Sequence, residues 1–175
     1  LSEEFGGEAG RLRMEQLVDG LQKIGFDYVL HTNFAADLTI WEEGNELLER
    51  LQEEKNLPMF TSCCPGWVRF AEVFYPELLN HLSTCKSPQQ MFGALVKTYW
   101  AQKMGIDPEK IVSVSIMPCT AKKYEAVRPE MVDSHYPDVD MVLTTREIAR
   151  LFKMAGIDPL KLAGAPFAAW MGEYT

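Results

Sequence analysis

The segment KIVSVSIM, residues 110–117, limits the fold more than any other stretch of the chain, because it has the strongest strand pattern and a helical pattern starts soon after it. The same order, a strand and then a helix, is expected over residues 59–75 and 140–155. Strands that alternate with helices indicate an α/β domain with a largely parallel sheet flanked by helices.

The remaining chain shows mostly helical periodicity. Apolar residues at helical spacing predict a helix over 14–24, which Gly25 would end. Residues 26–32, FDYVLHT, are expected to form a strand, and two further helices are expected over 37–51 and 88–105. The apolar face of the helix over 37–51 carries Leu47, Leu48 and Leu51.

Length and charge exclude several classes of protein. The 175 residues are enough for one domain with a hydrophobic core. The net charge of −8 and the scattered lysines disfavour a nucleic-acid partner, which normally meets a basic patch. No apolar run approaches the roughly 18 residues of a membrane span, so no membrane partner is expected. A cytoplasmic location is expected, with the periplasm as the alternative.

The chain contains four cysteines, Cys63, Cys64, Cys85 and Cys119. A domain of this length does not need disulfides for stability, so metal-binding or catalytic thiols are the better interpretation. The sequence has no CxxC pair, which argues against a structural zinc site and against a disulfide oxidoreductase.

Two cysteine segments follow expected strands. FTSCCPGW contains Cys63 and Cys64, and MPCTAKK contains Cys119. Ligands of parallel sheets bind beyond the carboxyl ends of the strands, so both segments are expected at one edge of the sheet. Each segment leads into a helix, whose N-terminus stabilises a thiolate, the form that binds iron or zinc. The alternative, buried cysteines acting as small hydrophobes, explains two matching segments poorly.

These two segments closely resemble the first and second signature motifs of the iron-only, or [FeFe], hydrogenases. ADLTIWEEGNELLER, LSTCKSPQQMFGALVKTYWAQKMGIDPEKI and VDMVLTTREIARL resemble the catalytic domain of the same family, so the likeness covers essentially all 175 residues. The resemblance implies a part of the iron-only hydrogenase large-subunit fold. It also implies the reversible oxidation of H2 to protons and electrons.

The resemblance further implies the H-cluster, a [4Fe–4S] cubane joined through one cysteine to a two-iron subcluster with CO, cyanide and azadithiolate ligands. Cys64 and Cys119 match two of the family's four cubane ligands. The other two belong to a third motif, with CxxxC, which residues 1–175 do not contain. This absence, the start without Met and the abrupt ending PFAAWMGEYT lead us to expect a portion of the catalytic domain that is inactive alone.

A proton route is implied by the same resemblance. Cys63 matches the thiol that faces the bridgehead amine and relays protons, and Glu43, Ser83 and Glu46 match the positions beyond it. The two glutamates are i, i+3 neighbours on one helix face, and Arg50 could pair with Glu46 at the outer end. The alternative for both glutamates is a solvated helix face.

The two-iron pocket is matched by a further set of residues. Lys122 matches a lysine that donates to a cyanide ligand, and the alternative for it is a surface charge. Glu125 is interpreted as structural, bracing its helix. The other positions that match pocket residues are Gln89, Ser87, Met117 and Pro65.

The remaining candidate side chains carry no ligand pattern. Cys85 is interpreted as a free thiol near the site. The three histidines are expected to be surface or capping residues; these are His31, His81 and His135.

Two alternatives to the enzyme are considered. Hydrogenase-like iron–sulfur assembly factors share the fold and a cubane but lack the two-iron unit, and sensory hydrogenases tend to lose the relay thiol. Cys63, Glu43 and Glu46 favour the enzyme over both. H2 and protons would be its substrates. Ferredoxin, NAD(P)-linked redox subunits or a cytochrome would be the electron partner, and the remainder of the hydrogenase chain a further partner.

Overall fold

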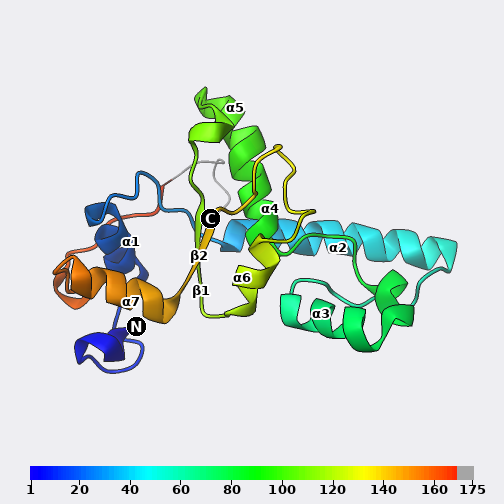
Figure 1. The fold of residues 1–175 in the computed structure, drawn as a ribbon, viewed down its shortest axis with the longest axis horizontal. Coiled ribbons are helices and arrows are strands. Elements are labelled where there is room, and N and C mark those ends of the chain that lie inside the picture. Colours follow the sequence, from blue (N-terminus) through cyan, green and yellow to red (C-terminus); the bar gives the residue numbers. More distant parts are fainter. Residues whose placement is uncertain (169–175) are drawn as a thin grey trace. The chain divides into compact units, whose positions relative to one another are not determined.

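The computed structural model describes residues 1–168 (Figure 1). Residues 169–175, which form most of the abrupt ending noted above, lie outside the described residues. Short 3-10 turns occupy Ser2–Phe5, Pro76–His81, Pro108–Lys110 and Pro159–Lys161. The helices and strands are α1 (Met14–Lys23), α2 (Asn33–Glu53), α3 (Pro65–Phe74), α4 (Pro88–Leu95), α5 (Ala101–Met104), β1 (Val114–Met117), α6 (Ala121–Ala126), β2 (Met141–Thr144) and α7 (Thr145–Met154).

The sheet is small and parallel. Within residues 1–168 it consists of β1 and β2, connected through α6, and the rest of the secondary structure is helical. The predicted α/β class with a parallel sheet is therefore confirmed. The strand expected over 110–117 starts only at Val114, because the 3-10 turn before it extends to Ile111, whose N–H donates to Pro108 O at 3.1 Å.

The described chain forms two compact units. One comprises residues 1–31, 116–118 and 143–168, and the other comprises residues 32–115 and 119–142. The division passes through β1 and β2, so each strand contributes residues to both units. Among residues 1–168, no helix combines the length and the apolar character needed to cross a bilayer.

The first unit has a conventional apolar core between α1 and α7. Thr144 caps α7 by accepting from the Glu147 N–H at 3.2 Å, and the Glu147 carboxylate accepts from the Thr144 N–H at 2.7 Å, which forms a capping box. The predicted helix over 145–155 is confirmed. Its buried side chains Ile148 and Phe152 pack with those of Val18, Leu21 and Val29.

The strand predicted over residues 26–32 is wrong. A strand requires a neighbour with which to form a ladder of backbone hydrogen bonds, and no such ladder involves this segment in the described residues. Instead, Val29 is buried in the core of the first unit, and its carbonyl accepts from the Ala168 N–H at 2.9 Å. The apolar residues of the segment therefore serve as core contacts of an extended loop.

The second unit contains the longest helix, α2, which begins and ends beyond the predicted 37–51. Its inward side is not its apolar side. Besides the small Ala35, its buried residues are Thr39 and Arg50, whereas Trp41 and Leu48 are 70% and 59% exposed. Leu47 and Leu51, which we expected on an apolar face, are also exposed. Polar side chains of α2 therefore face the interior of this unit.

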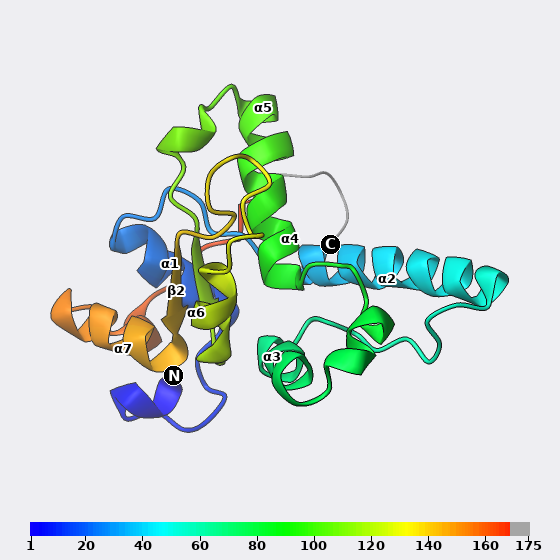
Figure 2. The same cartoon turned by 45° about the vertical axis from the view of Figure 1, so that its right-hand side comes forward.

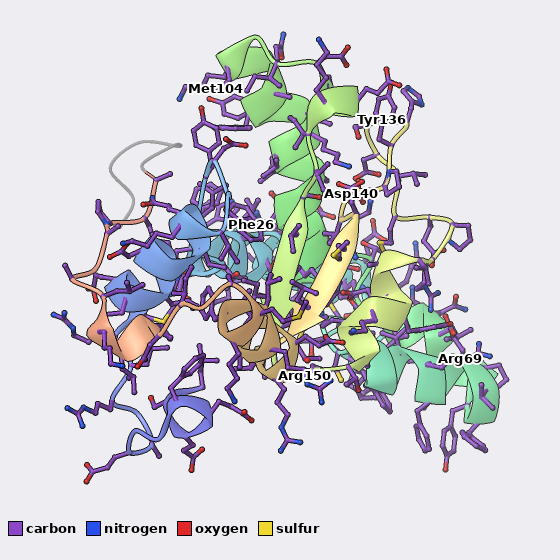
Figure 3. All side chains as sticks on the ribbon, turned by 60° about the vertical axis from the view of Figure 1, so that its left-hand side comes forward. Phe26, Arg69, Met104, Tyr136, Asp140 and Arg150 are labelled. Carbon is purple, nitrogen blue, oxygen red and sulfur yellow. The ribbon has the colours of Figure 1, made fainter. Side chains whose placement is uncertain are left out.

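The helix predicted over 88–105 consists of α4, a π-helical turn at Val96–Trp100 and α5, which form one continuous column (Figure 2). Gly105 ends it with a φ of 65°, a left-handed conformation that suits glycine. In the π turn, the buried Lys97 donates to Pro137 O at 2.6 Å and pairs with Asp140 at 2.7 Å. Figure 3 labels Asp140, immediately before β2.

Candidate functional site

The loop that carries the paired cysteines begins at an isolated parallel bridge between Phe60 and Leu82. The Phe60 N–H donates to His81 O at 2.8 Å, and the Ser83 N–H donates to Phe60 O at 2.7 Å. In the described residues this bridge is separate from the β1–β2 sheet. The prediction that both cysteine segments lie at one edge of the sheet is therefore wrong, because two apolar residues are too short a run to extend the pairing.

The cysteine thiols themselves are accessible. Cys63, Cys64 and Cys119 are free and exposed, which contradicts the alternative that they are small buried hydrophobes. Cys64 occupies the N-cap position of α3, and the buried Pro65 is the first residue of that helix, as predicted. Cys119 directly precedes Thr120, the N-cap of α6. Both predicted metal ligands therefore stand at the start of a helix.

Lys122 connects the two cysteine segments. Its ammonium donates to the carbonyl oxygen of Cys63 at 2.8 Å and to the two carboxylate oxygens of Glu125 at 3.0 and 3.3 Å. The Lys122 side chain is only 12% exposed, and Glu125 is buried. The alternative that Lys122 is a surface charge is therefore contradicted.

The amide of Gln89 lies within the same cluster. Its Nε2 donates to Glu125 Oε2 and to Lys122 O, both at 3.3 Å, while its Oε1 accepts from Ser115 Oγ at 2.8 Å. Ser87 is buried and caps α4 by accepting from a backbone N–H. Sequence reasoning missed Ser115, for which the only signal was a hydroxyl within an otherwise apolar strand. Met117, a further predicted pocket residue, ends β1 and is half-buried.

Glu46 is the centre of a second polar cluster. Its Oε2 accepts from Ser83 Oγ at 2.7 Å, its Oε1 accepts from Arg50 Nη2 at 2.6 Å, and both oxygens accept from the Thr84 N–H at 3.1 Å. Burial opposes ionisation, but the bonds from Ser83, Thr84 and Arg50 outweigh it and hold the pKa of Glu46 below its ordinary value. With a side chain only 14% exposed, Glu46 does not lie on a solvated helix face.

Arg50 pairs with Glu46 as predicted, but it is buried and not at an outer end. Its guanidinium supplies several hydrogen bonds to the turns on either side of the Phe60–Leu82 bridge. The accepting carbonyls, at 2.7 to 3.3 Å, belong to Asn56, Asn80, His81 and Leu82. Arg50 therefore fixes the backbone around Glu46.

Cys85 lies beside this second cluster, with its Sγ 3.9 Å from Glu46 Oε2. Burial raises the pKa of the Cys85 thiol, and the carboxylates of Glu46 and Glu43 add to that effect. Its carbonyl accepts from Ser62 Oγ at 2.7 Å, which anchors the cysteine loop. The Oε1 atom of Glu43 is buried without a hydrogen-bond partner in the described part of the chain.

The described contacts of the histidine rings lie outside both clusters. His31 packs edge-on against the ring of Phe167. His81 Nδ1 lies 3.0 Å from Pro58 O, and His135 is exposed in a turn with a φ of 68°.

Comparison with known proteins supports the fold. The family described as "Iron only hydrogenase large subunit, C-terminal domain" matches residues 1–175. Over its full length, the chain is 51% identical to the periplasmic [Fe] hydrogenase large subunit of Nitratidesulfovibrio vulgaris, and it covers 42% of that protein. The chain therefore belongs to the iron-only hydrogenase large-subunit family.

Two further similarities define the range of the family. A structure of a single-site variant of apo [FeFe]-hydrogenase HydA1 from Chlamydomonas reinhardtii superposes with a TM-score of 0.91 at 47% identity, over 96% of this chain and 43% of that one. Cytosolic iron-sulfur assembly component 3 of Mus musculus is 39% identical over 90% of this chain and 36% of its own length. The chain thus spans less than half of the relatives it matches.

The side chains present suit part of an iron–sulfur cluster. Exposed, free thiols at helix starts are the donors that iron prefers. Yet within residues 1–168 no three or more Cys, His, Asp or Glu side chains are grouped so as to hold a metal ion. The donors therefore fit the family's cluster in kind.

Proposed function

We propose that this chain is the H-cluster-bearing portion of an [FeFe] hydrogenase, which catalyses the reversible oxidation of H2 to protons and electrons. The observation that carries the proposal is the 2.8 Å bond from Lys122 Nζ to Cys63 O, because it joins the two motif segments in one cluster. The 51% identity to a hydrogenase large subunit supports the same conclusion.

Cys64 and Cys119 would hold two positions of a [4Fe–4S] cubane. When bound, the H-cluster supplies the metal site at which H2 forms or is split and the route by which electrons leave. The exposed thiols can be ligated without moving buried side chains. Two further cysteines would come from the part of the large subunit that residues 1–175 do not include, so we expect this chain alone to be inactive.

Cys63 would transfer protons between the two-iron unit and the protein, and its exposed thiol is free to do so. Glu43, Ser83 and Glu46 would continue the route. Support for its far end is the 2.7 Å bond from Ser83 Oγ to Glu46 Oε2. Support for the middle of the route is Glu43 Oε1, a buried acceptor that has no hydrogen-bond partner in the described residues and could accept a bond from a relay group.

The pocket of the two-iron subcluster, with its CO, cyanide and azadithiolate ligands, would be lined by Lys122, Gln89, Ser87, Met117 and Pro65. A buried ammonium suits an anionic ligand, and Lys122 Nζ lies 3.0 Å from Glu125 Oε2. The Gln89 amide is already committed to Ser115, Glu125 and Lys122, so its role would be to orient these groups.

An iron–sulfur assembly factor is the second candidate, favoured by the 39% identity to cytosolic iron-sulfur assembly component 3. Cys63, the buried Glu46 and the Ser83–Glu46 bond argue for the enzyme, because binding a cubane alone requires no proton route. A sensory hydrogenase is a third possibility, against which the presence of Cys63 again counts.

The electron partner would be ferredoxin or an NAD(P)-linked redox subunit, and the remainder of the large subunit would be the structural partner. We propose a cytoplasmic location, with the periplasm as the alternative because one relative is a periplasmic subunit.

A chimera tests the proposed function. Residues 1–175 would replace the matching segment of the N. vulgaris large subunit, which contributes the missing part of the fold, and H2 production would be measured after maturation. We expect activity within about tenfold of the parent, and absence of activity in a chimera with bound iron would contradict the enzyme. In the active chimera, Cys63→Ser should retain iron but slow turnover strongly, whereas Cys64→Ala should lose iron. Normal turnover in Cys63→Ser would contradict the relay.

A further inference from the structure

The buried carboxylate of Glu125 does more than brace α6. In the described residues, the Lys122 ammonium donates to the Cys63 carbonyl oxygen and to the two oxygens of the Glu125 carboxylate. We propose that Glu125 is a positioning residue, which orients Lys122 so that the ammonium holds the Cys63 loop next to the Cys119 segment before a cluster binds. The inference rests on the proposed function for the identity of the group that later occupies the site.

The charge of Glu125 is what keeps the ammonium in place. Glu125 is 4% exposed and the Lys122 side chain 12%, so both charges have lost most of their water. An ammonium buried without a counter-ion is unfavourable, so without the Glu125 carboxylate beside it the Lys122 side chain would turn to solvent. Its bond to Cys63 O would then break. The loop is therefore held through Lys122 only with the carboxylate of Glu125 in place.

Glu125 is itself fixed by neighbours from another part of the chain. Gln89 Nε2 donates to Glu125 Oε2 at 3.3 Å, and Gln89 Oε1 accepts from Ser115 Oγ at 2.8 Å. A hydrogen-bonded series thus runs from Ser115 on β1 through Gln89 and Glu125 to Lys122 and Cys63. A partly satisfied buried network would be unfavourable, and this one leaves the carboxylate little freedom to move.

Backbone order parameters measured by NMR on the cluster-free protein test this inference. In the wild type, residues 62–64 should show backbone order parameters of about 0.85, as expected for a rigid backbone. In Glu125→Gln, which keeps the shape of the side chain and removes its charge, the values at 62–64 should fall below about 0.6, while those of α2 stay unchanged. Lys122→Met should cause the same local drop.

The double variant shows whether Glu125 acts through Lys122. If it does, adding Glu125→Gln to Lys122→Met causes no further drop, whereas a purely structural role of Glu125 gives an additional one. The matched control is Glu72→Gln, which removes a carboxylate that pairs with Arg128 at 2.6 Å between α3 and the turn after α6. This variant should leave the backbone order parameters of residues 62–64 unchanged.

Three results would overturn the proposal. The order parameters of residues 62–64 could stay at the wild-type level in Glu125→Gln or in Lys122→Met, or they could fall further in the double variant than in Lys122→Met alone. Should Glu125→Gln not fold, Glu125→Asp retains the charge on a shorter side chain and should give intermediate values; wild-type values in both Glu125→Asp and Lys122→Met would then refute the inference. Because no cluster is present in these measurements, an inactive chimera would contradict the proposed function without changing their outcome.

Discussion

Helices α2 and α7 differ in the kind of large side chain that they bury. Helix α7 buries Ile148 and Phe152 completely and exposes Arg150, which Figure 3 labels on this helix. Helix α2 buries Thr39 and Arg50 and exposes large apolar side chains. The first follows the ordinary pattern of an amphipathic helix, and the second inverts it.

The inversion on α2 coincides with the candidate proton route. Thr39, Glu43, Glu46 and Arg50 recur at spacings of three and four residues and therefore share one side of the helix. Buried polar groups are unfavourable unless they are hydrogen-bonded, and three of these four have described partners on other parts of the unit. Such a departure from the ordinary pattern is expected at a functional face, which is consistent with the proposed proton route.

The largest effect should come from the apolar core of α7. Phe152→Ala removes a fully buried ring and should lower the free energy of unfolding by about 4 kcal/mol, measured by chemical denaturation. Met154→Ala, at a largely exposed position on the same helix, is the control and should change little. A small effect of Phe152→Ala would contradict the conventional core assigned to this unit.

The next effect should come from the polar side of α2. Arg50→Met leaves the Glu46 carboxylate without its counter-ion and removes the guanidinium from four backbone carbonyls, of which His81 O keeps the Phe60 N–H as donor. We therefore expect a loss of about 3 kcal/mol in the free energy of unfolding. The same substitution at the exposed Arg150 of α7 should cost less than about 0.5 kcal/mol. Equal losses at the two arginines would remove the contrast between the helices.

Glu46→Gln should give a smaller loss, about 1.5 kcal/mol at neutral pH, because the bonds to a charged acceptor become neutral ones. The pKa of Glu46 is lowered in the folded protein, so its carboxylate stabilises the fold above the ordinary glutamate value of about 4.3. That contribution is lost as the pH falls through the lowered folded pKa.

Thermal unfolding of wild type and Glu46→Gln between neutral and acidic pH measures this difference. The two melting temperatures should converge at low pH, while Glu49→Gln, at an exposed position on α2, should follow the wild type throughout. A constant difference between wild type and Glu46→Gln across this range would show that Glu46 is not held ionised by its partners.

The smallest effect should come from the exposed apolar side of α2. Leu48→Gln should change the free energy of unfolding by less than about 0.5 kcal/mol, because Leu48 is already accessible to water. The equivalent change at Ile148 of α7 buries an amide in an apolar core and should be strongly destabilising. A large loss in Leu48→Gln would show that this side of α2 is covered.

Much of the local structure could be predicted from the sequence. The helical spacing of α1 and α7, the glycines after them and the prolines that start α3 and α4 act within one or two turns, where short-range rules hold. The strand predicted over residues 26–32 does not form. The sequence could not show this, because alternating apolar residues do not say whether a neighbouring strand exists.

The site divides in the same way. Residue types and spacing located the cysteine segments and the pairing of Glu46 with Arg50, and the resemblance to the family pointed to Lys122 and Glu46. They did not reveal Ser115, or that Glu125 is the counter-ion of Lys122, since the hydrogen bonds that join them link separate segments. Nor could they show that the Cys63 loop lies outside the sheet.

By itself, the sequence determined the α/β class and the family, because these depend on periodicity and short motifs, and the candidate ligands follow from the resemblance to that family. Only the tertiary structure decided which side of α2 is buried and which group holds Cys63. Lys122 and Cys63 are 59 positions apart, and their contact depends on how α3 and α6 pack. Local patterns carry no record of such distant pairings, since the packing of many residues together selects them.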